Sequence, residues 1–253
     1  MAGLRNGVNA WRHQTETLVS VIADLLAGCR HVAVGAQSPI PGTGALLARR
    51  ESAGALRVSV LDTERHSAFT NGACELFDCA AEGRIDAFFL SGGQIDGRAN
   101  LNLVGVGTYP HVDVRWPGSF GSAFLYFLVP RVILFREEHS RRVFVEKVDF
   151  VSAPGTSEPG VFRPGGPHAL VTPLALFHFD RERARFGLAS VHPGHTIEEI
   201  VAHTGFDFDR DPPSVETPAP TQTRRALMRE IVRDEVSEIY PRFAARFLGV
   251  GTS

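Results

Sequence analysis

Two hydrophobic patterns alternate along the first hundred residues. Apolar residues recur at helical spacing in three segments, which are residues 11–28, 43–50 and 73–83. Short apolar runs typical of buried strands accompany them, at residues 31–35, 57–61 and 84–90. Strands that alternate with helices indicate parallel pairing with helices on the faces. The pattern therefore predicts an α/β fold with an open, mostly parallel sheet flanked by helices.

The second half of the chain is richer in strand-like pattern. Further strands are expected at residues 103–107, 112–116, 124–129, 131–135, 144–151, 169–171, 174–179 and 186–192. A Pro/Gly-rich loop at 153–167 interrupts them. Thr196 is the candidate N-cap of a short helix at 196–204. A Pro/Thr-rich linker at about 211–222 and an amphipathic helix at about 224–247, interrupted at Pro241, complete a single domain of residues 1–253.

Composition excludes several classes of protein. A chain of 253 residues with 43% hydrophobic and 21% charged residues is long enough for a sizeable core. A net charge of −2 argues against nucleic-acid binding. Three cysteines form neither a disulfide framework nor a zinc pattern, so we expect a reducing cytoplasm. No signal peptide and no run of 18 apolar residues is present, so no membrane span is expected.

The stretch from residue 88 to 102 is where the chain is most informative. A buried run ends in Ser91-Gly92-Gly93, and four polar residues follow, which are Gln94, Asp96, Asn100 and Asn102. Adjacent glycines allow a backbone to approach a ligand closely, and ligands in α/β sheets lie beyond the carboxyl ends of strands. A strand–turn–strand with ordinary turn chemistry explains the same residues equally well.

Four other polar segments can be considered as candidates for catalysis or for ligand binding. A second glycine–serine turn, Gly118-Ser119-Phe120-Gly121, offers backbone N–H groups to an anion or oxyanion, or is a plain turn. Asp62 and Glu64 follow the second strand and are either catalytic carboxylates or part of a solvated loop. The loop at 36–42 lacks a Walker lysine and a GxGxxG pattern, which disfavours a nucleotide site there. The consecutive residues 137–139, Glu-Glu-His, cannot converge on one metal ion from a regular element.

The central stretch resembles a known family. Gly93-Gln94-Ile95-Asp96, followed by Asn100-Leu101-Asn102, is similar to the GxQ(I/V)D…GN(L/V)N signature of the β subunits of family I CoA-transferases. Similar segments recur in the same order along most of the chain, at residues 32–41, 118–121, 138–142, 148–155 and 204–207.

The resemblance implies a CoA-transferase (NagB/RpiA-like) fold, a separately encoded α subunit and a common α2β2 assembly. It implies an acyl-CoA thioester as substrate at the subunit interface, with no permanently bound cofactor and no metal. Gly92, Gly93 and Gln94 would border the acyl-thioester pocket, and Asn100 would hold that loop. The opposite wall would come from Gly118, Ser119, Phe120 and Gly121.

The sequence departs from the family pattern at two places. The family's nucleophilic glutamate normally ends the second strand, where this chain has Leu61-Asp62-Thr63, so Asp62 or the displaced Glu64 would have to serve. Ala99 stands where the family usually has glycine. Three hypotheses follow: a CoA-transferase that uses Glu64 or Asp62, a CoA-thioester hydrolase, C–C lyase or decarboxylase whose catalytic residue lies in the α subunit, and a non-catalytic scaffold subunit.

Overall fold

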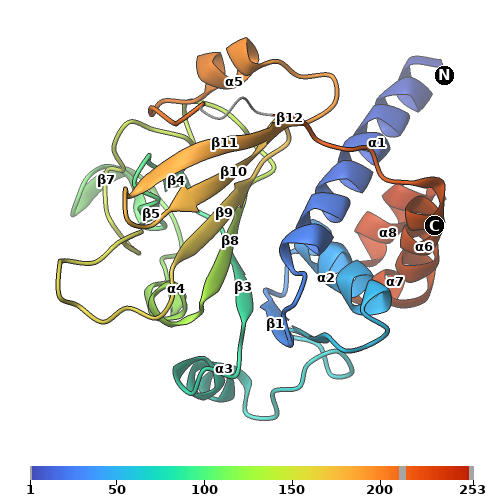
Figure 1. The fold of residues 1–253 in the computed structure, drawn as a ribbon, viewed down its shortest axis with the longest axis horizontal. Helices are drawn as coiled ribbons and strands as arrows, with labels where there is room; N and C mark the ends of the chain where they lie inside the picture. The colour runs from blue at the N-terminus through green and yellow to red at the C-terminus, as the bar shows by residue number, and fades with distance from the viewer. Residues whose placement is uncertain (1, 211–214, 251–253) are drawn as a thin grey trace. The chain divides into compact units, whose positions relative to one another are not determined.

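The computed structural model describes residues 2–210 and 215–250 in two compact units (Figure 1). The first unit combines Met1–Gly72 with Pro218–Ser253, and the second is Ala73–Thr217. That the whole chain acts as one domain stays a prediction.

In the first unit, helices surround a parallel pair of short strands. Its elements before residue 72 are α1 (Ala2–Leu25), β1 (His31–Val34), α2 (Pro39–Glu51) and β2 (Arg57–Val60). Strands β1 and β2 are parallel, with His31 opposite Arg57. The buried face of α1 packs on α2, and the fully buried residues there include Ile22, Leu26, Leu46 and Leu47. This arrangement confirms the helix–strand alternation that the sequence predicts.

The end of the chain contains more elements than the one interrupted helix expected at 224–247. It forms α6 (Gln222–Ile231), a π-helical turn (Val232–Val236), α7 (Ser237–Ile239) and α8 (Pro241–Leu248). Pro241 occupies the first turn of α8, where its missing N–H has no helical partner to lose. The predicted break at this residue is therefore confirmed, whereas the π-helical turn has no counterpart in the sequence prediction.

The second unit contains the larger part of the sheet. Its strands are β3 (Ala87–Leu90), β8 (Arg131–Phe135), β9 (Pro167–Val171), β10 (Ala175–Asp180), β11 (Arg185–Val191) and β12 (Val215–Glu216). They lie in the order β12-β11-β10-β9-β8-β3, and β8 to β11 run side by side in Figure 1. The pairs β3–β8, β8–β9 and β11–β12 are parallel, whereas β9–β10 and β10–β11 are antiparallel. The predicted open, mostly parallel sheet is confirmed.

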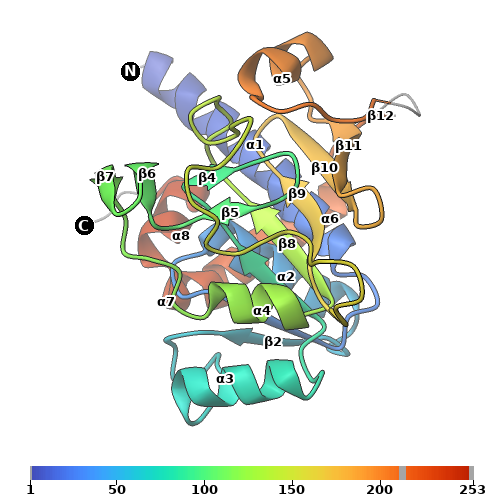
Figure 2. The same cartoon turned by 90° about the vertical axis from the view of Figure 1, so that its left-hand side faces the viewer.

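Helices and small antiparallel pieces complete the second unit. The helices are α3 (Gly72–Ala81), α4 (Ser122–Leu128) and α5 (Ile197–His203). The small pieces are β4 (Gln94–Ile95) with β5 (Leu101–Asn102), and the hairpin β6 (Gly105–Thr108) with β7 (His111–Arg115), all visible in Figure 2. The strand–turn–strand expected after residue 90 is therefore present. The N-cap of α5 is also as predicted, because the Thr196 hydroxyl accepts a hydrogen bond from the Glu199 N–H.

Two predicted strands are wrong. Residues 124–129 are apolar and β-rich in sequence, but they lie in α4 and the residue that follows it, and tertiary contacts of Leu125 and Tyr126 outweigh propensity there. Residues 144–151 form an irregular segment with one isolated bridge, between Ile95 and Phe144. In place of a ladder, the N–H groups of Asp149 and Val148 donate to the side-chain oxygens of Gln94 and Asp96.

The predicted linker at 211–222 is partly outside the described residues, since 211–214 are not described. Val215–Glu216 pairs with β11, and α6 already begins at Gln222. None of the described helices combines the length and apolar character that crossing a membrane requires.

Candidate functional site

The turn after β3 places Gly93 against an aromatic ring. The Gly93 N–H donates to the Asn102 carbonyl oxygen at 2.9 Å, which starts the β4–β5 pair. A Cβ added at Gly93 would collide with the Trp116 ring. A glycine is required here so that Trp116 can pack directly on the backbone.

Gln94 is the centre of a buried hydrogen-bond network. Its Oε1 accepts from Asn102 Nδ2 at 2.7 Å and from the Asp149 N–H at 2.9 Å. Its Nε2 donates to Asp149 Oδ2 at 3.1 Å, and that oxygen also accepts from the Gly107 N–H. The Gln94 side chain is 5% exposed and is absent from the linings of the two cavities beside this region. It therefore connects three segments and does not border the pocket as the resemblance implied.

Asp96 organises the following turn in the same manner. Its carboxylate accepts hydrogen bonds from the Arg98 N–H at 3.0 Å, the Asn100 N–H at 3.1 Å and Asn100 Nδ2 at 3.0 Å. Ala99 has a φ of 57° and its carbonyl accepts from the Tyr126 hydroxyl at 2.8 Å. The position where the family usually has glycine thus has a left-handed backbone in this chain, at a cost of about 1 kcal/mol for alanine.

A cavity of about 580 Å³ opens beside the glycine turn, and we call it the glycine-turn cavity. It is lined by Ser91, Gly92, Gly93, Leu103, Val106, Val114, Trp116, Pro117, Gly118, Arg136, Arg142 and Val143. Its walls are mostly apolar, and its only charged lining residues among those described are the two arginines. An apolar cavity with a few polar groups is the usual form of a small-molecule site.

Arg136 has unused hydrogen-bonding capacity in this cavity. Its Nε is buried without a hydrogen-bond partner among the described residues, and its ion pair with Glu138 spans 3.8 Å. Glu138 is already engaged by Arg142, which donates to both of its oxygens at 2.6 and 3.2 Å. The hydrogen bonds from Arg142 and Ser140 keep the pKa of Glu138 below its usual value. The site therefore presents one satisfied carboxylate and one guanidinium that can still bind an anion.

The second glycine turn contributes less to this cavity than the sequence suggested. Gly118 lines it, whereas Ser119, Phe120 and Gly121 do not. Phe120 is 87% exposed, has a φ of 44° and contacts Phe77.

The cavity residues that sequence reasoning missed include one large aromatic residue and both of its arginines, which are Trp116, Arg136 and Arg142. In sequence, Trp116 is only the last residue of a predicted strand. In the charged turn after residue 135, the sequence raises only the question of a metal site, which consecutive residues cannot form. Neither segment carries a local signal that links it to the turn after β3.

The candidate nucleophiles lie in the first unit, whereas both cavities belong to the second. Asp62 and Glu64 are exposed residues of the loop after β2. This loop folds back on its strand, because the Val60 N–H donates to the His66 carbonyl oxygen at 2.7 Å. Asp62 has a φ of 58°, a conformation that occurs more often at functional turns than elsewhere.

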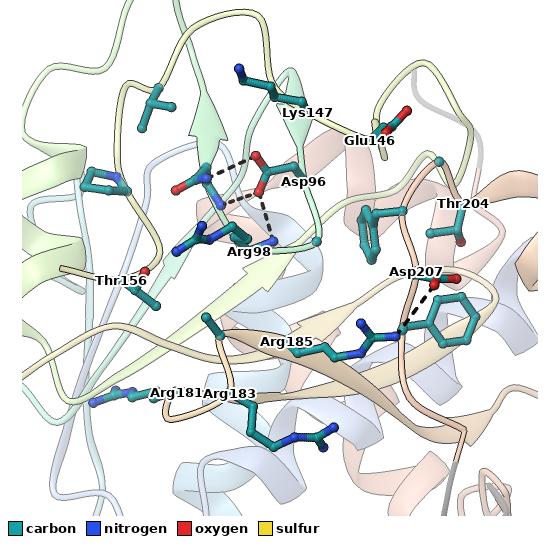
Figure 3. Close-up of a pocket in the computed structure, with 18 of the residues that line it drawn as sticks. Asp96, Arg98, Glu146, Lys147, Thr156, Arg181, Arg183, Arg185, Thr204 and Asp207 are labelled. Carbon is teal, nitrogen blue, oxygen red and sulfur yellow. Dashed lines mark hydrogen bonds and ion pairs between the residues drawn. The ribbon is translucent and has the colours of Figure 1, made fainter. Parts of the chain in front are cut away.

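A second cavity, of about 1220 Å³, lies next to the Asp96–Asn100 turn and is shown in Figure 3. Asp96, Arg98 and Asn100 line it, together with residues from the 154–159 loop, the β10–β11 turn and the segment 204–210. Because many of its lining side chains are arginines, we call it the arginine cavity.

Comparison with known proteins gives a consistent result. The model of the Coenzyme A transferase family matches residues 14–203. The chain is 32% identical to the B subunit of 3-oxoadipate CoA-transferase of Pseudomonas knackmussii over 155 residues, which is 59% of each chain. It is 34% identical to the B subunit of glutaconate CoA-transferase of Acidaminococcus fermentans over 149 residues, 56% of this chain and 55% of the relative. The match thus spans little more than half the length of these curated relatives.

One further relative and two solved structures, two of these three with other activities, match a larger share of the chain. The cholesterol ring-cleaving hydrolase IpdB subunit of Rhodococcus jostii is 25% identical over 236 residues, 83% of this chain and 88% of the relative. Among solved structures, glutaconate coenzyme A-transferase from Acidaminococcus fermentans superposes with a TM-score of 0.74 at 26% identity, covering 86% of this chain and 93% of that chain. The decarboxylase AibA/AibB shares the fold, with a TM-score of 0.74 at 23% identity and coverage of 89% and 98%.

Proposed function

Because this chain belongs to the coenzyme A transferase family, we propose that it is the β subunit of a two-chain enzyme acting on acyl-CoA thioesters. The names of two relatives support this, since both are B subunits of CoA-transferases. The proposal includes a separately encoded α subunit, an α2β2 assembly and a cytoplasmic location.

The observation that carries the proposal is the glycine-turn cavity. Its apolar walls suit an acyl chain, and Gly92, Gly93 and Gly118 give the backbone close access to a thioester. Arg136 would bind an anion that forms during the reaction, either the thioester oxyanion or the free carboxylate. Gln94 and Asn100 act indirectly, by fixing the turns on either side of β4.

The proposed reaction moves CoA between an acyl-CoA and a carboxylate. A carboxylate of Glu64 or Asp62 attacks the thioester carbonyl, which breaks the C–S bond, expels the CoA thiolate and leaves a mixed anhydride between the enzyme and the acyl group. The thiolate then attacks the enzyme's own carbonyl, which releases the first acid and leaves an enzyme–CoA thioester. A second carboxylic acid reverses these steps and departs as its CoA thioester. Covalent catalysis of this kind divides one difficult transfer into easier ones.

A second candidate function is hydrolysis, C–C cleavage or decarboxylation of a CoA thioester, with the catalytic residue in the α subunit. The specific observation in its favour is Leu61-Asp62-Thr63, which stands where the family's glutamate is expected. The similarity to a ring-cleaving hydrolase subunit over most of the chain supports it too. A scaffold subunit without catalytic residues is the third possibility.

One trapping experiment separates these functions. The chain is purified with the α subunit encoded beside it, incubated with acyl-CoA, and treated with borohydride or hydroxylamine before peptide mapping. A modified Asp62 or Glu64 supports transfer. Consumption of acyl-CoA by water or by C–C cleavage, without an adduct, supports the second function. An absence of turnover with every acyl-CoA supports the scaffold.

Variants provide the matched controls for that experiment. Glu64→Gln and Asp62→Asn should each be compared with Glu230→Gln, which alters an exposed carboxylate of α6. Arg136→Gln should lower kcat/KM by about tenfold or more, because a charged hydrogen bond to the reacting anion is lost. Unchanged turnover in Arg136→Gln would remove the glycine-turn cavity from the reaction.

A further inference from the structure

The arginine cavity collects positive charge, most of which has no ion-pair partner among the described residues. Its lining contains seven cationic and five acidic side chains, although the whole chain has a net charge of −2. Among the described residues, no carboxylate forms an ion pair with five of these cations, which are Arg98, Arg141, Lys147, Arg181 and Arg210. Arg183 and Arg185 are the exceptions, since both pair with Asp209.

Arg98 belongs to a turn that several side-chain hydrogen bonds hold together. The Asp96 carboxylate binds the Arg98 and Asn100 N–H groups, and Gly155 N–H donates to Asn100 Oδ1 at 3.1 Å. The left-handed Ala99 is buried beneath, tied to Tyr126. Only the Arg98 side chain of this turn is exposed. A strained, fixed backbone that presents one unpaired guanidinium is typical of a binding site.

Other cationic residues line the cavity from separate segments, and Lys147 and Arg181 are labelled in Figure 3. Arg181 donates to the carbonyl oxygens of Pro130, Gly166 and Pro167, and burial lowers its pKa. Thr156 and Ser157 add hydroxyl groups from the loop before β9. The donors thus surround a space too large for a single carboxylate.

The acidic lining residues do not cancel this charge. Asp96 already accepts hydrogen bonds from its own turn, and Asp207 lies 3.8 Å from Arg185. Glu146, Glu158 and Glu182 are exposed. These carboxylates can accept hydrogen bonds from hydroxyl or amino groups, which a ribose and a nucleobase carry.

From this arrangement we propose that the arginine cavity binds a phosphorylated ligand of nucleotide size, with Arg98 and Lys147 contacting its phosphates. Guanidinium and ammonium groups recognise phosphate oxygens with charge-assisted hydrogen bonds. A volume of about 1220 Å³ accommodates a molecule of that size. The phosphates belong either to the 3′-phospho-ADP part of a CoA thioester or to a separate phosphorylated molecule.

The test measures binding of adenosine 3′,5′-bisphosphate and of pyrophosphate by calorimetry, with the full chain in complex with its α subunit. Arg98→Gln and the double variant Arg98→Gln/Lys147→Gln are compared with Arg242→Gln, which removes an exposed arginine on α8. The Arg98 N–H that binds Asp96 is retained in each variant, so the turn should persist. We expect the single variant to weaken bisphosphate binding about tenfold and the double variant more, with Arg242→Gln unchanged.

Competition distinguishes the two sources of phosphate. If CoA supplies it, CoA competes with the bisphosphate, and Arg98→Gln raises the Kd of CoA but not that of dephospho-CoA. If a separate molecule supplies it, the bisphosphate and CoA bind together, and Arg98→Gln leaves the Kd of CoA unchanged. Both results support a phosphate site.

Equal binding of the bisphosphate by the wild type and the double variant would overturn the proposal. So would an absence of saturable binding by the wild type at low ionic strength, where phosphate contacts are strongest. Turnover of acyl-CoA is measured on the same samples. If the complex turns over acyl-CoA but Arg98→Gln does not weaken bisphosphate binding, only this inference is contradicted. If the complex turns over no acyl-CoA, the result counts against the proposed function instead.

Discussion

Gln94 connects segments that no local rule joins. Its side chain makes hydrogen bonds to Asn102 and Asp149, which lie 8 and 55 residues away. The same residue seemed from the sequence to face a substrate. In the folded chain it instead determines where the glycine turn, β5 and the segment around Asp149 lie relative to one another.

Replacing Gln94 with alanine should therefore destabilise the fold. The buried amide of Asn102 and the partly buried N–H of Asp149 would lose their acceptor, and we expect the free energy of unfolding to fall by about 2–3 kcal/mol. Urea denaturation followed by circular dichroism measures this change. Gln37→Ala, at an exposed glutamine, is the control and should stay within about 0.5 kcal/mol of the wild type. Equal effects of the two substitutions would contradict the structural role.

Gly155 is the second residue whose replacement gives a clear expectation. A Cβ there would lie 2.8 Å from the carbonyl carbon of Ala99, so the loop before β9 could no longer pack on the Asp96–Asn100 turn. Gly155→Ala should cost about 2 kcal/mol or more, because the obstructing atoms are backbone. Gly187→Ala has its nearest neighbour at 3.9 Å and should be close to neutral. Comparable melting temperatures for the two variants would refute this.

At the scale of elements, one side chain of α6 forms ion pairs with both α1 and α2. Arg224, in the first turn of α6, donates to Asp24 at 2.6 Å and to Glu51 at 2.7 Å. Both acceptors remain partly exposed, so Arg224→Gln should lower the free energy of unfolding by only about 1 kcal/mol. The loss should shrink in high salt, which screens the ion pairs already present in the wild type. Arg242→Gln on α8 is the matched control, and an equal loss there would show that the network contributes nothing.

Secondary structure was predictable from sequence where hydrophobic period and burial agree. Strand β3 is buried on every residue, and its sequence is an uninterrupted apolar run. The wrong predictions occur where contacts between residues far apart in the sequence determine the secondary structure. Tyr126 is helical because its ring is buried and its hydroxyl reaches Ala99. Asp149 bonds to Gln94 and Gly107 in a segment that alternates like a strand.

The residues of the candidate site also divide into those with a local sequence signal and those that only the fold brings together. Gly92, Gly93 and Gly118 could be predicted, because turn glycines after strands have a local signal. Trp116 and Arg136 could not, since only the fold brings residues from the end of β7 and the segment after β8 to the turn after β3. Local patterns cannot report whether a polar residue is buried, so the burial of Gln94 could not be predicted.

The whole molecule should be sensitive to mild acid, because several histidines are buried as neutral groups. Burial lowers the pKa of His139, His168 and His192 to about 4 in each case. The rings of His203 and His195 lower the pKa of His139 further, whereas Glu199 raises it. The Nδ1 atom of His192 contacts the Thr217 hydroxyl at 2.8 Å, and its Nε2 is buried without a partner among the described residues.

The direction of the pH effect follows from comparing the folded and unfolded states. Between about pH 6.5 and pH 4 the unfolded chain binds protons at these histidines that the folded chain does not, so stability falls as the pH falls. Each fully buried histidine contributes at most about 1.4 kcal/mol per pH unit in that window. Urea midpoints at pH 7, 6 and 5 measure the slope. His192→Gln should flatten it, whereas His111→Gln, at an exposed histidine of β7, should not. An identical slope in the wild type and in His192→Gln would mean that protonation of other groups causes the loss of stability.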